Sequence, residues 1–373
     1  MAIESISGRR ATAGALTAYV EGLMDAAGVD RPSSAAVARA VVDASARGVD
    51  THGVRLVPWY LRMVEGGRIN RTPDVTVSAR TAAVAHVDSD DGFGHRASFL
   101  AVEEGCRLAR ESGVGIVTVG RSTHHGATGV YTRAAALEGF AAIGMTHADS
   151  AVVPHGGSRA FFGTNPISFA VPVPAGEPML LDMATSSIPF NRVHLRRATG
   201  TPLPPEVAVD AAGETTLDPF AAAALHPLGG AAFGYKGGAL AAMVDILCSA
   251  FTGMGHGATH APLGGPDYSR PIRLGHFFIV MAPDAFQSAD VFGGRVSAFL
   301  DDLRAAPARP GHQVMAPGDP EIAEAAHRRR LGIPVDDVTW NGLAEAARRF
   351  GVAIPEAQET GEDAVGENKV AQS

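Results

Sequence analysis

Residues 88–97 read DSDDGFGHRA, and this stretch decides which nucleotide-binding fold the chain can have. It contains the pattern G-x-G-x-x-A, from Gly92 to Ala97, between a run typical of a strand and a run typical of a helix. It therefore superficially matches the Rossmann fingerprint for dinucleotides. Three carboxylates precede the glycines: Asp88, Asp90 and Asp91. They would repel a pyrophosphate at the start of the helix, where this motif normally holds it. We predict that any nucleotide site in this chain is of another kind.

The sequence on either side of this stretch alternates between short apolar runs and helical patterns. The runs typical of strands are residues 75–78, 82–87, 115–119, 141–145, 167–171, 179–181 and 277–281. The helical patterns are residues 12–27, 34–47, 97–111, 127–137, 236–251, 285–303, 321–331 and 336–350. This alternation predicts an α/β fold. Two stretches rich in Pro, Gly and Ala, 199–234 and 253–273, are expected to be long ordered loops near a site.

The composition is that of a soluble globular protein that binds neither nucleic acid nor membranes. The 373 residues include Lys+Arg 31 and Asp+Glu 39, for a net charge of −8. Such a chain lacks the basic surface that supplies most nucleic-acid affinity, and anionic membranes repel it. No run reaches the roughly 18–20 apolar residues of a membrane span, and no signal peptide is apparent, so we expect a cytoplasmic protein. Cys106 and Cys248 lie in helical patterns and are expected to be buried thiols. The polar stretch 356–373 is expected to be disordered.

Asp50-Thr51-His52-Gly53 follows a helical pattern that ends at Gly48. A histidine on such a loop can act as a general acid, because its ordinary pKa lies near neutrality. Arg55 can present a planar fork to a substrate carboxylate, as an α-keto or α-hydroxy acid would require, or it can be a solvated surface cation.

A group of histidines follows in the middle of the chain: His124, His125, His147 and His155. With Asp149 they suggest a metal site, since imidazole and carboxylate bind zinc or iron. Their spacing does not resemble H-E-x-x-H, and adjacent loop histidines often point apart. We therefore predict no metal site and expect hydrogen-bonded imidazoles when each histidine is considered alone.

Two further segments are suited to a cofactor. Residues 181–186, LDMATS, end an apolar strand in a turn of small and hydroxyl residues, where ligand phosphates or amides can approach the backbone; Asp182 can instead cap the following helix. Gly234-Tyr235-Lys236 lacks the adjacent Gly-Lys pair of a Walker loop. Lys236 is expected in the first turn of an apolar helix, against the helix dipole, which favours an anionic ligand there; pairing with a neighbouring carboxylate is the alternative.

Together these segments resemble the type-2 malate/L-lactate dehydrogenase family, which includes ureidoglycolate, sulfolactate, 2,3-diketogulonate and cyclic imino acid oxidoreductases. The resemblance extends from about residue 13 to residue 351. The matching strings occur in order: GVDTHGV (48–54), EGGRIN (65–70), DGFG (91–94), STHHG (122–126), GTNP (163–166), LDMATS (181–186), YKG (235–237), GHFF (275–278) and PGDP (317–320).

The resemblance implies a non-Rossmann α/β fold with a mixed or antiparallel sheet flanked by helices, and a homodimer whose active site lies near the subunit contact. It implies a helical subdomain of residues 1–50 with 310–355, a substrate and dimer region of 51–120 with 275–309, and a nicotinamide-dinucleotide-binding domain of 121–274.

It also implies roles for individual residues. His52 is the proton donor or acceptor at the substrate oxygen, and His124 lines the same site. Thr51, Arg55 and Asn165 are expected to bind substrate. The expected cofactor contacts are His147, Asp182, Met183, Ala184, Thr185, Ser186, Tyr235, Lys236, Gly237, Pro317, Gly318 and Asp319.

The sequence departs from the family pattern at several positions. Thr51 replaces a common serine, many relatives have the arginine one residue after Arg55, and Asp319 replaces a usual glutamate. His125 and His147 occupy positions that are usually aromatic and asparagine, so they add two imidazoles that can change substrate choice.

The predicted activity is hydride transfer between NAD or NADP and a small 2-oxo or 2-hydroxy acid, with a histidine handling the proton. A cyclic imine reductase is the alternative within the family. A metal-dependent hydrolase or lyase, and a relative that binds nucleotide without turnover, are alternatives from other classes. The sequence does not choose between NAD and NADP.

Overall fold

The computed structural model describes residues 9–356, 358 and 359, and the chain divides into two compact units. Residues 1–65 with 319–373 form what we call the terminal unit, and residues 66–318 form the central unit. Most of the expected disordered tail, 356–373, lies outside the described residues.

The terminal unit is mainly helical. Its helices are α1 (Ala13–Ala26), α2 (Arg31–Ala46), the short 3₁₀ helices η1 (Asp50–His52) and η2 (Val54–Leu56), α3 (Val57–Gly66, at the boundary), α9 (Asp319–Leu331) and α10 (Asp337–Phe350). Strand β1 (Arg9–Ala11) pairs antiparallel with β11 (Ile333–Val335) and β12 (Gln358–Glu359). Thr12 and Asp336 cap the N-termini of α1 and α10. Each side chain accepts one backbone N–H of the first turn that has no partner within the helix.

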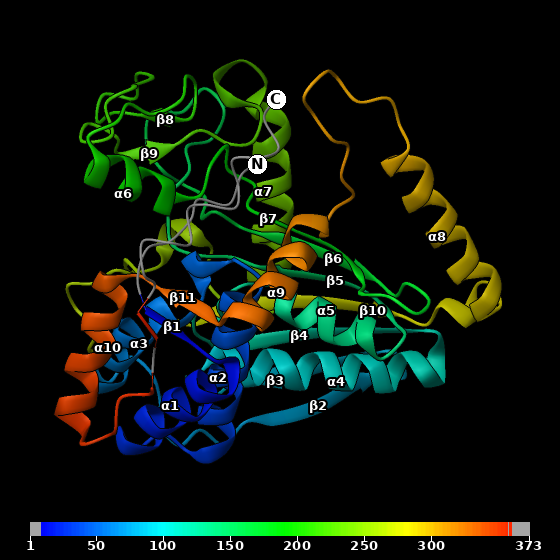
Figure 1. The fold of residues 1–373 in the computed structure, drawn as a ribbon, viewed down its shortest axis with the longest axis horizontal. Helices are drawn as coiled ribbons and strands as arrows, with labels where there is room; N and C mark the ends of the chain where they lie inside the picture. Colours follow the sequence, from blue (N-terminus) through cyan, green and yellow to red (C-terminus); the bar gives the residue numbers. More distant parts are fainter. Residues whose placement is uncertain (1–8, 357, 360–373) are drawn as a thin grey trace. The chain divides into compact units, whose positions relative to one another are not determined.

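A seven-stranded mixed sheet forms the centre of the central unit, in the order β2-β3-β4-β10-β5-β6-β7 (Figure 1). The strands are β2 (Thr76–Thr81), β3 (Val84–Asp88), β4 (Val114–Ser122), β5 (Ala141–Thr146), β6 (Ile167–Val171), β7 (Met179–Met183) and β10 (Leu274–Met281). Only β3 and β4 pair in parallel; the other neighbours are antiparallel. The expectation of a mixed, largely antiparallel, non-Rossmann sheet is confirmed.

Alternating side chains give the sheet two covered faces. On one face, Phe277 of β10 packs with Val244 and Cys248 of α7 (Gly230–Ser249). On the other face, Val280 of β10 lies against Gly105 of α4 (Gly94–Ser112), and α5 (Gly129–Leu137) covers β5 and β6. Helix α8 (Ala289–Arg304) follows β10.

A small subregion built around its own core lies beyond β7. It contains α6 (Phe190–Thr199) and the pair β8 (Ala208–Val209) and β9 (Ala224–Leu225), which lie together in Figure 1. The composition of residues 199–234 predicts only loop, but the stretch contains β8, β9 and the start of α7. Neither α6 nor α3 is predicted from the sequence.

The glycines of the DSDDGFGHRA stretch serve packing. A Cβ on Gly94 would lie 2.3 Å from the carbonyl oxygen of Thr123, and a Cβ on Gly92 would lie 2.6 Å from Pro73. The Gly94 N–H donates to the Thr123 hydroxyl at 3.2 Å, so this donor at the start of α4 is already used within the protein. The rejection of the Rossmann interpretation is therefore supported by close backbone packing.

Helix α7 starts at Gly230, six residues before its predicted start at Lys236. By length and composition it is the one helix in the described part of the chain that could cross a membrane. A partly buried core helix passes the same test, and one face of α7 packs on the sheet.

Candidate active site

The turn that carries His52 is held by a buried arginine of the terminal unit. Arg328 of α9 is 2% exposed, and its Nη1 and Nη2 donate to the two carboxylate oxygens of Asp50 at 2.6 and 2.9 Å. Nη1 also donates to the Ser45 carbonyl at 2.7 Å, and Nε donates to Glu324 at 2.5 Å. Because Asp50 is the first residue of η1, this fork fixes the start of the turn that ends at His52.

Gly53 allows the turn to approach α2 closely. A Cβ at this position would lie 2.0 Å from the Ser45 hydroxyl, which accepts the Val54 N–H at 3.0 Å. A side chain at position 53 would therefore push the turn away from the helix.

His52 is half-buried, and its Nδ1 lies 2.9 Å from the Thr51 hydroxyl. Burial lowers the pKa of His52 to about 4, and the positive charge of Arg55 contributes to this. The imidazole is therefore neutral at pH 7, which is the form that can accept a proton from an alcohol. Arg55 is exposed.

The central unit has a pocket of about 360 Å³. Its lining residues are His124, Ala148, Asp149, Ser150, Ala151, Thr164, Phe190, Ala223, Leu263 and Gly264. The Nδ1 of His124 accepts the Gly126 N–H at 3.2 Å, so the neutral ring carries its proton on Nε2. The pocket volume is suited to a small ligand.

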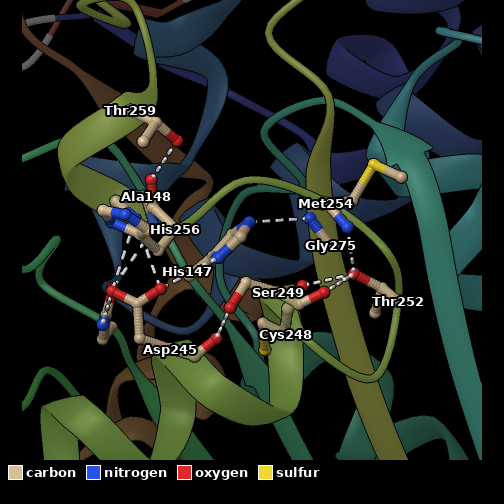
Figure 2. A network of polar contacts seen from close by, with 12 residues as sticks. His147, Ala148, Asp245, Cys248, Ser249, Thr252, Met254, His256, Thr259 and Gly275 are labelled. Atoms are coloured by element: carbon tan, nitrogen blue, oxygen red, sulfur yellow. Dashed lines mark hydrogen bonds and ion pairs between the residues drawn. The ribbon is translucent and has the colours of Figure 1, made fainter.

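His147 is fully buried beside the pocket residue Ala148 (Figure 2). Its Nε2 accepts the Gly275 N–H at 2.9 Å, which leaves the proton on Nδ1, 3.5 Å from Asp245 Oδ1. Burial opposes ionisation of Asp245, but His147, the Gly257 N–H and Asn165 outweigh it, and the pKa of Asp245 lies below its ordinary value. His147 is fully buried and bonds protein groups, so in this structure it supports the pocket from behind.

Asn165 is also fully buried. Its Oδ1 accepts the Ala148 N–H at 3.3 Å, and its Nδ2 donates to the Ala241 carbonyl at 3.0 Å. Its φ of 39° lies in the left-handed region, which asparagine tolerates better than most residues. The side chain therefore ties the GTNP loop to α7 and to the pocket residue Ala148.

The expected cofactor turn is connected to α7 through backbone bonds. The Thr185 N–H and hydroxyl both donate to the Thr164 carbonyl, and the Thr185 carbonyl accepts the Leu228 N–H at 2.8 Å. Gly237 then donates to the Leu228 carbonyl, and a Cβ on Gly237 would lie 2.4 Å from the Leu228 backbone. Gly237 thus allows residue 228 to lie on the helix and support the turn.

Tyr235 and Lys236 are exposed on α7. The expectation that Lys236 opposes the helix dipole in the first turn is wrong, because the helix begins at Gly230. Its ammonium lies 5.9 Å from the Tyr235 ring centre and 5.8 Å from that of the exposed Phe233. Among the described residues no carboxylate pairs with Lys236. An exposed cation beside aromatic surface fits a dinucleotide, which offers phosphates and flat rings.

The other expected cofactor residues lie in several places. Asp182 Oδ2 accepts the Gly129 N–H at 2.7 Å at the start of α5, a helix that precedes it in the chain. The following helix, α6, has Pro189 as its N-cap, so the expectation that Asp182 caps that helix is wrong. Met183 and Ala184 are half-buried, and Ser186 is buried with its hydroxyl donating to the Ile188 carbonyl.

The carbonyl of Pro317 accepts the Leu180 N–H at 3.4 Å, and Gly318 has a φ of 95° beside Leu180. Asp319 begins α9 of the terminal unit.

His125 and His276 form a stacked buried pair, with ring centres 4.3 Å apart. Hydroxyls bond all four ring nitrogens: those of Ser98, Thr128, Thr146 and Ser122. Burial lowers the pKa of His276 to about 3, so this ring is neutral. His276 lies in the GHFF string, but nothing in the sequence marks it as a member of this pair.

Within residues 9–356 and 358–359, no group of three or more His, Cys, Asp or Glu side chains is arranged to hold a metal ion.

Comparison with known proteins decides the family. A sequence profile described as malate/L-lactate dehydrogenase matches residues 12–344. The chain belongs to this family. It is 32% identical over 344 residues to a malate dehydrogenase of Pyrococcus abyssi, covering 90% of this chain and 94% of the relative. It is 33% identical over 329 residues to the ureidoglycolate dehydrogenase (NAD(+)) of Escherichia coli, covering 88% and 93%.

A third relative is the (2R)-3-sulfolactate dehydrogenase (NADP(+)) of Chromohalobacter salexigens, 34% identical over 265 residues, covering 70% of this chain and 78% of the relative.

Solved structures of family members have the same fold. The malate dehydrogenase of Entamoeba histolytica matches with a TM-score of 0.88 at 27% identity, covering 94% of this chain and 100% of that one. The delta1-piperideine-2-carboxylate reductase of Pseudomonas syringae matches with a TM-score of 0.82 at 28% identity, covering 91% and 99%. The predicted family and the predicted dehydrogenase class are confirmed, and the relatives named with a cofactor use NAD(+) or NADP(+), in agreement with the predicted cofactor.

Proposed function

We propose that this dehydrogenase transfers a hydride between NAD or NADP and a small 2-oxo or 2-hydroxy acid. The observation that carries the proposal is the pocket of about 360 Å³ beside His124, since its size suits a small acid and its lining Thr164 is bonded to the expected cofactor turn at Thr185. Family membership supplies the reaction class, and the pocket supplies a place for the small reactant.

In the proposed reaction, His52 gives or takes the proton at the substrate oxygen. A pKa of about 4 keeps the imidazole neutral, so it is ready to accept a proton when a hydroxy acid is oxidised. In reduction it must first be protonated, and the negative charge that develops on the substrate oxygen favours this. Arg55 and Thr51 of the same loop are proposed to bind the substrate carboxylate.

The remaining roles are proposed in the same way. His124 lines the substrate pocket, and its Nε2 proton can be donated to a substrate oxygen. Asn165 and His147 act through the pocket wall, because their side chains bond protein groups. When bound, the nicotinamide ring supplies or accepts the hydride. Lys236 and Tyr235 with residues 182–186 and 317–319 are proposed to hold the dinucleotide.

We also propose the domain roles and assembly that the resemblance implies: nucleotide binding by residues 121–274, substrate and dimer contacts by 51–120 with 275–309, a helical subdomain of 1–50 with 310–355, and a cytoplasmic homodimer. Reduction of a cyclic imine is the second candidate, supported by the similarity to the piperideine-carboxylate reductase structure.

The deciding experiment titrates NADH and NADPH against the purified protein and then follows loss of reduced-nicotinamide absorbance with a panel of 2-oxo acids and cyclic imines. Saturable binding of one cofactor, with turnover of at least one 2-oxo acid, is expected. Turnover of cyclic imines alone would establish the second candidate. Cofactor binding without turnover of any compound would contradict both.

A further inference from the structure

The pocket beside His124 has one charged side chain on its wall. Asp149 is the only acidic or basic residue among the lining residues other than His124 itself. The remaining polar side chains there, Ser150 and Thr164, are uncharged. A substrate that enters this pocket therefore meets a carboxylate.

The orientation of Asp149 is built into the fold. Its Oδ2 accepts the Leu263 N–H at 3.0 Å, and Leu263 itself lines the pocket. The loop that carries Leu263 is held by the buried Arg68, which donates to the carbonyls of Pro262 and Leu263 at 2.9 and 3.3 Å and also to the carbonyl of Asp267. Arg68 belongs to the EGGRIN string, so that string supports this wall.

The loop is also pressed against the start of the central unit. A Cβ on Gly66 would lie 2.5 Å from Cβ of Tyr268, and the Arg68 guanidinium lies 5.0 Å from the Tyr268 ring centre. These contacts support the position of the loop whose Leu263 N–H binds Asp149.

No cationic side chain in the described part of the chain pairs with the Asp149 carboxylate. Arg68 uses its guanidinium on backbone carbonyls and acts on Asp149 only through its charge. Burial raises the pKa of Asp149, while the Leu263 N–H opposes this. A carboxylate in such surroundings is stabilised by a ligand that offers N–H groups and destabilised by a second anion.

We propose that Asp149 determines substrate specificity. It selects small 2-oxo acids, or cyclic imines, that present an N–H donor to the pocket, and it rejects those with a second anionic group, such as dicarboxylic and sulfonated acids. This inference rests on the proposed function and narrows its substrate class. It means that the enzyme is a poor catalyst for malate and oxaloacetate.

The test compares two substrates of nearly identical shape. Oxaloacetate ends in a carboxylate, and its amide, 2-oxosuccinamate, ends in an N–H donor. The ratio of kcat/KM for the amide to that for oxaloacetate is expected to be about tenfold or more in the wild-type enzyme. In Asp149→Asn it should fall by about tenfold or more, because the asparagine oxygen still accepts the Leu263 N–H while the charge is lost.

Matched variants separate charge from structure. Glu345→Gln removes an exposed carboxylate of α10 that does not line the pocket, and it should leave the ratio as in wild type. Asp149→Ser, measured with its thermal unfolding midpoint, provides a second neutral variant if Asp149→Asn folds poorly.

An unchanged ratio in both neutral Asp149 variants, or a wild-type preference for oxaloacetate, would overturn the inference while leaving the proposed dehydrogenase intact. Absence of turnover with every oxo acid and imine of the panel would overturn the proposed function and this inference with it.

Discussion

Replacing Arg328 by methionine should release the turn that carries His52. The substitution keeps most of the apolar stem but removes the two bonds to Asp50, the bond to the Ser45 carbonyl and the bond to Glu324. The Arg328 side chain is 1% exposed and that of Asp50 is 23% exposed, so the pair is largely desolvated. Breaking a buried ion pair from one side costs about 3–5 kcal/mol, and the partial exposure of Asp50 places the expected loss near about 3 kcal/mol.

The catalytic consequence is separate from the loss of stability. A catalytic group displaced by about 1 Å can lower the rate by ~10²-fold. Arg328 acts through His52, so its effect on kcat should largely vanish in a His52→Ala background, whereas its effect on unfolding should remain. Urea unfolding and kcat are therefore measured for wild type, both single variants and the double variant.

Arg328→Lys is the conservative control. It retains the charge but not the planar fork, so it should recover part of the stability and less of the turnover. The reasoning is refuted if Arg328→Met loses less than about 1 kcal/mol, the range of an exposed pair. It is equally refuted if the two kcat effects simply multiply in the double variant.

Three further outcomes are expected. His52→Ala should lower kcat by ~10²–10⁴ with cofactor affinity nearly intact, as measured by steady-state kinetics and NADH titration; near-wild-type turnover removes His52 from the mechanism. His276 has a pKa of about 3 in the folded protein, well below the ordinary pKa of histidine. As the pH falls below that ordinary pKa, the unfolded chain binds a proton at His276 and the folded protein does not, so the folded state loses stability. Wild type should lose about 2 kcal/mol more than His276→Gln between pH 7 and pH 5 in urea unfolding, and equal losses contradict this. Gly237→Ala places a methyl group 2.4 Å from the Leu228 backbone, so it should lower the free energy of unfolding by about 1–3 kcal/mol and weaken NADH binding. Gly14→Ala in α1, which has open space around it, should do neither. Equal effects of the two substitutions would exclude the steric explanation.

The strands of the sheet could be predicted from sequence because they are short, mostly apolar and flanked by turn residues, whereas their mixed pairing was implied by the family resemblance. The ends of the helices were harder to predict. Helix α7 begins with Gly230, and Gly234 lies within its second turn, where intrinsic propensity argues against a helix. Gly234 packs closely on Pro227, and Gly230 has a positive φ and packs on Glu206, so tertiary contacts override local preference. Helix α6 is short and polar on average, and only Phe190 and Val193 pack on the neighbouring core, so its apolar pattern is weak in the sequence.

The site was predicted unevenly for a related reason. A histidine on a loop after a helix end is visible in the sequence, and so is a strand that ends in small residues. The partners that hold them are not, because Arg328 lies 278 residues from Asp50 along the chain and Asp245 lies far from His147. The error for Lys236 has a local cause. The sequence pattern placed the start of α7 at Lys236 and not at Gly230, so Lys236 was wrongly assigned to the first turn.

The strings that carry the family resemblance specify the scaffold more than the substrate. Several of their glycines occupy crowded positions: a Cβ on Gly53, Gly66 or Gly94 would lie 2.0, 2.5 or 2.3 Å from a neighbouring atom. Such glycines keep loops close to the elements that orient reactive side chains, whichever acid is bound. Asp149 lies in none of these strings, yet it is the charged wall of the pocket. Since the relatives are named for acids of different charge, we expect family membership to predict the hydride-transfer chemistry and Asp149, a pocket residue outside the strings, to contribute to the choice of acid.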